Sequence, residues 1–121
     1  MIHHIDIHVR DLGGPKRLID ALAPGLDFRC RSVDEDFVGY EPSAGGRPRF
    51  GIQLDPDHVP GSMRIAFEVD SAQRVDELGA AARAAGARVI EGPGPHPEYG
   101  DDYYAVFFED DQGNKYEILR R

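Results

Sequence analysis

The sequence has a single cysteine, no tryptophan and no long apolar run. Cys30 has no partner for an internal disulfide, which is typical of a protein from a reducing compartment. No run approaches the roughly 20 apolar residues of a membrane-spanning helix, and the opening MIHHIDIHVR lacks the basic-then-apolar order of a secretion signal. We therefore expect a cytoplasmic protein that has no membrane partner.

The chain has fewer basic residues than acidic residues. The 14 Lys and Arg residues are outnumbered by 22 Asp and Glu residues, which gives a formal net charge of −8. Binding to nucleic acid needs a basic face, and the sequence shows none, so we expect no nucleic-acid partner. A chain of 121 residues is long enough to bury one core without disulfides. We expect one domain, residues 1–121, whose partner is a small-molecule ligand.

The order of predicted elements occurs twice along the chain. In each half, an alternating strand precedes an amphipathic helix and three further strands, and residues 55–61 read as a linker between the halves. In the second helix, Asp70 and Gln73 resemble a capping box, and Gly86 stands where a helix-ending glycine belongs. The pattern predicts an α+β fold of two βαβββ modules, module 1 at about 1–55 and module 2 at about 62–121. We expect these modules to form a cupped mixed sheet with the helices on its outer face.

Two internal alignments support this duplication. HIDIHVRD superposes on RIAFEVDS, and GIQL superposes on YEIL after a shift of one residue, which aligns Gln53 with Glu117. Apolar residues in these strands share one parity and should face the helices. The other face then carries His4, Gln53, Arg64 and Glu117, which would converge if the two halves curl into a cup. A three-residue hairpin loop at 111–113 places Phe107 opposite Glu117, so Tyr103 and Phe107 share that face.

Three segments carry a resemblance to a known family. HHIDIHVRDL, RIAFEVD and FFEDDQGNKYEIL resemble the recurrent segments of the vicinal oxygen chelate superfamily, which includes glyoxalase I, bleomycin-resistance proteins and extradiol dioxygenases. The resemblance covers essentially the whole chain and implies the glyoxalase-like fold. Small proteins with this resemblance are often homodimers, so the resemblance implies a homodimer. The cup would then be built either within one chain or across two chains. Members of this superfamily isomerise, cleave, conjugate or only bind, so both enzymatic and non-enzymatic functions stay open.

The resemblance implies a metal-ligand set that this chain fills only in part. His4 matches the first-strand histidine of the family, Glu117 matches its last-strand carboxylate, and Gln53 stands where some members add a ligand. These three groups could hold one divalent metal, Zn, Ni, Mn or Fe. Arg64 stands where the second histidine belongs, and a guanidinium has no lone pair to donate.

The charge of Arg64 argues against a metal beside it. A unit cation about 4 Å from a divalent ion is repelled by roughly 8 kcal/mol at an effective dielectric constant of about 20. The set of His4, Gln53, Arg64 and Glu117 is already close to neutral without an ion. We therefore expect Arg64 to act as the cation itself, paired with Glu117, so that the site needs no metal.

Other polar residues on the same face are candidates for proton transfer and for ligand contact. His8 could act as a general base, since free histidine titrates near neutrality, and Glu68 is a second candidate. Tyr103 and Phe107 could line an apolar wall, with Arg64 binding the anionic group of a substrate. The Pro/Gly-rich residues 92–102, which contain His96, could form a lid or a passive surface loop.

Two functions follow as hypotheses. In the first, the protein is a metal-free binding module that takes a small polar or aromatic molecule at Arg64, Tyr103 and Phe107. In the second, it is a lyase or isomerase in which a metal on His4, Gln53 and Glu117 polarises two substrate oxygens, while Glu68 or His8 moves a proton. A dioxygenase ranks third, because the facial triad of two histidines and one carboxylate lacks its second histidine.

Overall fold

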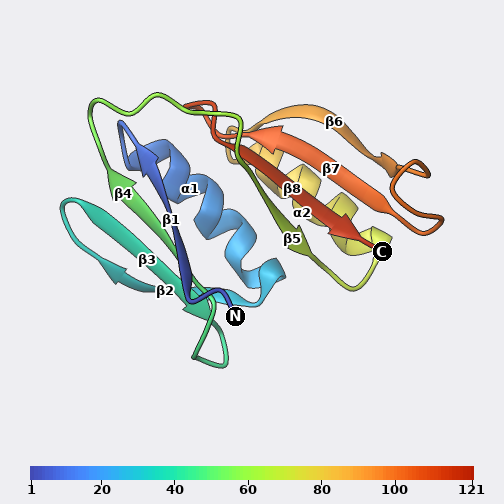
Figure 1. Cartoon of the computed structure of the whole chain (residues 1–121), viewed down its shortest axis with the longest axis horizontal. Helices are drawn as coiled ribbons and strands as arrows, with labels where there is room; N and C mark the ends of the chain where they lie inside the picture. The colour runs from blue at the N-terminus through green and yellow to red at the C-terminus, as the bar shows by residue number, and fades with distance from the viewer.

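All 121 residues are described by a computed structural model, in which two βαβββ modules follow one another (Figure 1). Module 1 contains β1 (His4–Val9), α1 (Gly13–Leu22), a 3-10 turn η1 (Ala23–Leu26), β2 (Phe28–Val33), β3 (Phe37–Pro42) and β4 (Arg49–Leu54). Module 2 contains β5 (Arg64–Glu68), α2 (Ala72–Ala84), β6 (Arg88–Pro95), β7 (Tyr104–Glu109) and β8 (Lys115–Arg120). No helix has both the length and the apolar character needed to cross a membrane.

The eight strands form two four-stranded sheets with the same topology. Sheet 1 has the order β1-β4-β3-β2, and sheet 2 has the order β5-β8-β7-β6. In each sheet the first strand pairs in parallel with the last strand of its module, and the remaining pairs are antiparallel. The predicted α+β fold of two mixed-sheet modules is confirmed. The strands β1 and β5 end their sheets and are not hydrogen-bonded to each other.

One face of each sheet is buried in a core that the two modules share. The predicted apolar parity holds, since Ile52, Tyr116 and Ile118 are almost fully buried together with side chains of α1 and α2. Phe67 of β5 packs edge-on against Phe28 and Phe50 of module 1, with ring centroids 6.4 and 6.0 Å away. The helices cover the core-facing side of each sheet (Figure 1), so the opposite sides carry the polar side chains.

The start of α2 differs by one residue from the predicted capping box. Ser71, not Asp70, is the N-cap, and its hydroxyl accepts a hydrogen bond from the backbone N–H of Arg74 at 3.1 Å. Ser71 has the extended backbone that an N-cap requires, and serine and aspartate cap equally well, so the sequence alone could not choose between them. Gly86 follows the helix with a φ of +97°, which confirms the predicted helix end.

The strand β6 is longer than the sequence predicts. It continues to Pro95, through residues that were expected to form a loop, and Gly94 and Pro95 pair with Ala105 and Tyr104 of β7. Two register shifts interrupt this pairing, and Gly92 has a φ of +83° at the second of them. An edge strand tolerates proline and a bulge because one row of its backbone groups needs no partner.

The β7–β8 hairpin has the predicted pairing, with Phe107 opposite Glu117. Its loop is organised by Asp110, which is only 4% exposed. The Asp110 carboxylate accepts hydrogen bonds from the Gln112 and Asn114 backbone N–H groups, the Asn114 amide and the Tyr116 hydroxyl, at 2.9 to 3.2 Å. Gly113 supplies the left-handed residue, with a φ of +88°.

Candidate functional site

The polar side of sheet 2 holds a buried carboxylate. Glu117 lies between Tyr116 and Ile118, which face the core, so its own side chain points to the opposite side of β8. It is nevertheless only 7% exposed. One carboxylate oxygen accepts a hydrogen bond of 2.5 Å from the Tyr103 hydroxyl, and the other accepts none from the protein. We call Arg64, Tyr103, Phe107 and Glu117 the sheet 2 face.

The contact with Glu117 changes the acidity of Tyr103. Partial burial, together with the hydrogen bond to the Glu117 carboxylate and its negative charge, raises the pKa of Tyr103 to about 12. Burial disfavours the Tyr103 phenolate by removing water from it, and the Glu117 carboxylate disfavours it by charge repulsion. Tyr103 is therefore a neutral hydrogen-bond donor at physiological pH, and it holds the carboxylate in place.

Arg64 lies on the same side of the sheet but does not pair with Glu117. Its guanidinium carbon is 4.9 Å from the centre of the Phe107 ring, a cation–π contact, and it forms no ion pair. The predicted ion pair between Arg64 and Glu117 is wrong. The register explains this, because Ala66 is the residue opposite Glu117, while Arg64 stands opposite Lys115. The guanidinium remains exposed and free to bind an anion.

The connection between β6 and β7 covers part of this face. The ring of His96 is 6% exposed and meets the Phe107 ring edge-on at 5.1 Å, while Tyr99 stacks on His96 at 5.7 Å. Tyr99 also meets the Tyr103 ring at 5.2 Å. Tyr99 is not among the predicted ligand-binding residues, although an aromatic residue in the loop that precedes Tyr103 is a usable signal for one. Tyr99 is 62% exposed, so it offers the accessible aromatic surface that the buried Phe107 does not.

Glu68 lies further along β5 at an open depression of about 740 Å³ beside the sheet 2 face. Tyr99, Tyr103 and Arg121 line the same depression. The Glu68 carboxylate lies 3.4 Å from the guanidinium of Arg121. Glu68 is thus near the predicted ligand-binding residues and is paired with Arg121.

The predicted first-half residues lie on sheet 1. His4 pairs in register with Arg49, whereas Gln53 pairs with His8. His4 and Gln53 are therefore about 13 Å apart along the strand direction, at roughly 3.3 Å for each of four residues. The Gln53 amide donates to the backbone carbonyls of Asp36 and Leu54. The expected juxtaposition of His4 and Gln53 at one metal is therefore wrong for residues of one chain.

The register also corrects the internal alignment. If β1 is superposed on β5 so that His4 meets Arg64, then Asp6 meets Ala66, and their β4 and β8 partners are Gly51 and Glu117. Gly51, not Gln53, is the counterpart of Glu117. A slip of two residues keeps every side chain on its face, so alternation could not detect it.

Within one chain, the structure does not join the predicted metal ligands. No hydrogen bond or ion pair connects His4 or Gln53 with Glu117, and the His4 ring is instead close to His3 and to the Asp6 carboxylate. His8 hydrogen-bonds to Asp55 at 2.9 Å, so it lies apart from the sheet 2 face. Arg64, Tyr103, Phe107 and Glu117 are the predicted residues that the fold does bring together.

Comparisons with known proteins agree with this architecture. The sequence model described as "Glyoxalase/Bleomycin resistance protein/Dioxygenase superfamily" matches residues 23–118. A comparison with curated proteins finds no match.

Several solved structures share the fold over nearly the whole chain. A glyoxalase/bleomycin resistance protein from Albidiferax ferrireducens T118 is 28% identical, with a TM-score of 0.83 and coverage of 100% of this chain and 98% of that one. A putative glyoxalase from Bacillus halodurans is 26% identical, with a TM-score of 0.81 and coverage of 100% and 96%. The fosfomycin resistance protein FosX from Listeria monocytogenes is 16% identical, with a TM-score of 0.76 and coverage of 100% and 93%, and shows likeness of fold alone.

Proposed function

The chain belongs to the glyoxalase/bleomycin resistance protein/dioxygenase superfamily, and we propose that it binds a small anionic molecule on the sheet 2 face. In this proposal the Arg64 guanidinium binds a carboxylate or phosphonate of the ligand. Glu117 accepts a hydrogen bond from a hydroxyl or amine of the same ligand. Tyr103 and Tyr99 contact the apolar part of the ligand, while the cation–π contact with Phe107 holds the Arg64 guanidinium in position.

The proposal rests on two oppositely charged side chains, Arg64 and Glu117, that lie on the same face and form no ion pair with each other. Arg64 has no ion-pair partner although Glu117 is close by on the same face, and Glu117 has one oxygen without a hydrogen-bond donor. That oxygen is still accessible, since Arg49 Nε is the one buried side-chain polar atom without a partner, so a ligand can reach it. A ligand with an anionic group and a neighbouring donor would satisfy both side chains at once.

The metal-dependent lyase or isomerase is the second candidate, and one observation favours it. The second carboxylate oxygen of Glu117 accepts no hydrogen bond from the protein, so a metal could use it. A divalent ion there would draw on His4 from a second copy of the chain, with Glu68 placed to move a proton. Arg64 is an exposed cation on the same face and would repel the ion, so we rank this function below anion binding.

We also propose that the protein is a cytoplasmic homodimer. Its polar sheet faces do not meet within one chain, and exposed apolar side chains are available to a second copy: Ile2, Val33, Val59, Met63 and Ile90. Cys30 is a free, exposed thiol, in keeping with a reducing compartment. Sedimentation equilibrium should give a mass of twice the 13.4 kDa of one chain. A mass of 13.4 kDa at micromolar concentration would contradict the dimer.

A suitable probe for the proposed function is mandelate, which combines a carboxylate, a hydroxyl and an aromatic ring. Titration calorimetry should show binding with a dissociation constant of about 1 mM or tighter, a scale that corresponds to roughly 4 kcal/mol. Replacing Arg64→Ala should weaken binding about tenfold, since a charge-assisted hydrogen bond contributes about 1.5 kcal/mol or more.

The matched control is Arg88→Ala, which removes a cation from the same sheet that already pairs with Glu109 at 2.6 Å. It should leave mandelate binding unchanged. The neutral analogue mandelamide should bind wild-type and Arg64→Ala protein equally weakly. If Arg64→Ala binds mandelate as tightly as the wild type does, the proposed anion site is wrong.

A further inference from the structure

A second group of polar side chains lies at the carboxyl-terminal ends of β1 and β4 in sheet 1. The strands β1 and β4 run in parallel, so their carboxyl-terminal ends meet at one edge of the sheet. His8 is the last outward-facing residue of β1, and Asp55 directly follows β4. The backbone N–H of Asp55 donates to the Val9 carbonyl at 2.7 Å, which fixes the exit of the chain next to His8.

A tight turn then brings His58 back toward His8. The His58 N–H donates to the Asp55 carbonyl at 3.0 Å, and the Asp57 N–H donates to Asp55 Oδ1 at 3.3 Å. Asp55 thus uses Oδ1 to close the turn and directs Oδ2 to His8 Nδ1, at 2.9 Å. The His8 and His58 rings lie 5.9 Å apart between centroids. The turn is what places two imidazoles and a carboxylate together.

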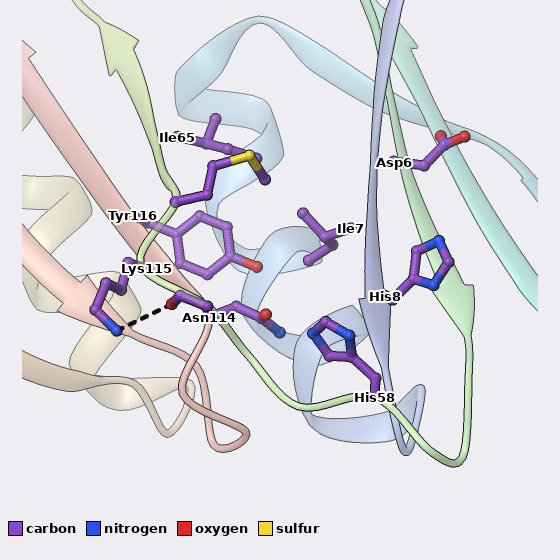
Figure 2. Close-up of a pocket in the computed structure, with 10 residues that line it drawn as sticks. Asp6, Ile7, His8, His58, Ile65, Asn114, Lys115 and Tyr116 are labelled. Atoms are coloured by element: carbon purple, nitrogen blue, oxygen red, sulfur yellow. Dashed lines mark hydrogen bonds between the residues drawn. The ribbon is translucent and has the colours of Figure 1, made fainter.

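The three side chains lie close enough together to bind one metal ion. One donor atom from each of His8, Asp55 and His58 lies within 4.8 Å of the other two. Ligand atoms about 2.0–2.2 Å from one zinc ion are themselves roughly 3.3–3.5 Å apart, so small side-chain rotations would complete the site. Figure 2 shows His8 on β1 and His58 on the connection between β4 and β5, and both line a pocket of about 150 Å³.

We propose that His8, Asp55 and His58 bind one divalent transition metal ion such as Zn²⁺, Ni²⁺ or Co²⁺. Two imidazole nitrogens and one carboxylate oxygen suit these ions better than Mg²⁺ or Ca²⁺, which prefer oxygen ligands. Three protein ligands leave positions open toward the pocket, which Asp6 and Asn114 also line. The metal site uses neither Arg64 nor Glu117, so this proposal does not depend on the proposed anion site.

The position of the site assigns it a role in joining the modules. His58 belongs to the connection between β4 and β5, whereas His8 belongs to β1. A metal ion held by both would fasten this connection to sheet 1. The pocket beside it is lined on its other side by Met63, Lys115 and Tyr116 of module 2, so the bound ion would lie where the two modules meet (Figure 2).

The test is titration calorimetry of tag-free, metal-depleted protein with Zn²⁺ and, separately, Ni²⁺. We expect one ion per chain with a dissociation constant of about 10 µM or tighter. His8→Ala and His58→Ala should each weaken binding at least tenfold, and Asp55→Asn should also weaken it. Because Asp55 closes the turn, circular dichroism must show that Asp55→Asn is folded; the two histidine variants test the site without that risk.

The matched control is His4→Ala, which removes another exposed histidine from the outward face of the same strand. Its Zn²⁺ affinity should equal that of the wild type, and Glu117→Gln should behave in the same way. Binding that survives both His8→Ala and His58→Ala would overturn the proposal, as would binding that is lost in His4→Ala or Glu117→Gln. The absence of any binding at 100 µM metal, about tenfold above the expected constant, would also overturn it.

Discussion

Replacing Asp110→Ala should lower the free energy of unfolding by about 3 kcal/mol, because it removes a buried, charged acceptor of four hydrogen bonds. Two of these bonds hold the backbone of the β7–β8 loop, and the Tyr116 hydroxyl would lose its partner inside the core. Urea unfolding measures the effect, and thermal unfolding should show a decrease of about 10 °C in the midpoint.

The neighbouring aspartate provides the control for this prediction. Asp111 is exposed and makes no hydrogen bond or ion pair through its side chain, so Asp111→Ala should change stability by less than about 0.5 kcal/mol. If Asp110→Ala costs less than about 1 kcal/mol, the loop does not depend on its carboxylate. The register that places Phe107 opposite Glu117 would then need another explanation.

Tyr103 should ionise about 100-fold less readily than an ordinary tyrosine, since its pKa is raised from 10.0 to about 12. Carbon-13 NMR of ring-labelled tyrosine follows this titration directly. Glu117→Gln should lower the Tyr103 pKa, because the carboxylate charge disappears while the partial burial remains. A Tyr103 pKa that is close to 10, or one unchanged by Glu117→Gln, would contradict the hydrogen bond between the two side chains.

The same shift predicts how stability depends on pH. A group whose pKa is raised in the folded state stabilises the protein below its unfolded-state pKa. For Tyr103 this contribution is fully present below pH 10 and is lost as the pH rises from 10 to about 12. Tyr103→Phe cannot ionise at this position, so wild-type protein should lose more stability than Tyr103→Phe across that window.

The sequence was sufficient to predict features that depend on alternation and on hairpin geometry. Apolar parity correctly assigned Ile52, Tyr116 and Ile118 to the core, and the turn at 111–113 correctly paired Phe107 with Glu117. Each of these inferences uses contacts between residues that are neighbours in one strand or across one turn. Such contacts are set by backbone geometry alone.

The features that the sequence could not predict depend on longer-range choices. The parallel pairing of β1 with β4 has no turn to fix its register, so Gln53 was assigned to the position that Gly51 occupies. The partner of Arg64 depends on a side-chain conformation that stacks it on Phe107. The burial of Phe107 depends on a loop that folds His96 back over the sheet, which no periodic pattern encodes.

A second group of arginines lies on sheet 1 and offers a small anion an alternative to Arg64. Three arginines, Arg29, Arg31 and Arg49, surround the carboxylate of Glu41 at 3.0, 3.3 and 3.9 Å. Those cations already share a counter-charge, whereas Arg64 has none. We therefore expect a small anion to prefer Arg64, although sheet 1 has more arginine residues on its surface.

The decisive measurement is a two-dimensional NMR titration of uniformly nitrogen-15-labelled protein with mandelate. Shift changes should concentrate on the amides of Arg64, Phe107 and Glu117 and on the loop that contains Tyr99, and Arg64→Ala should abolish that pattern. Changes centred instead on residues 29–31, 41 and 49, with the amides of β5 and β8 unmoved, would show that sheet 2 does not form the ligand site.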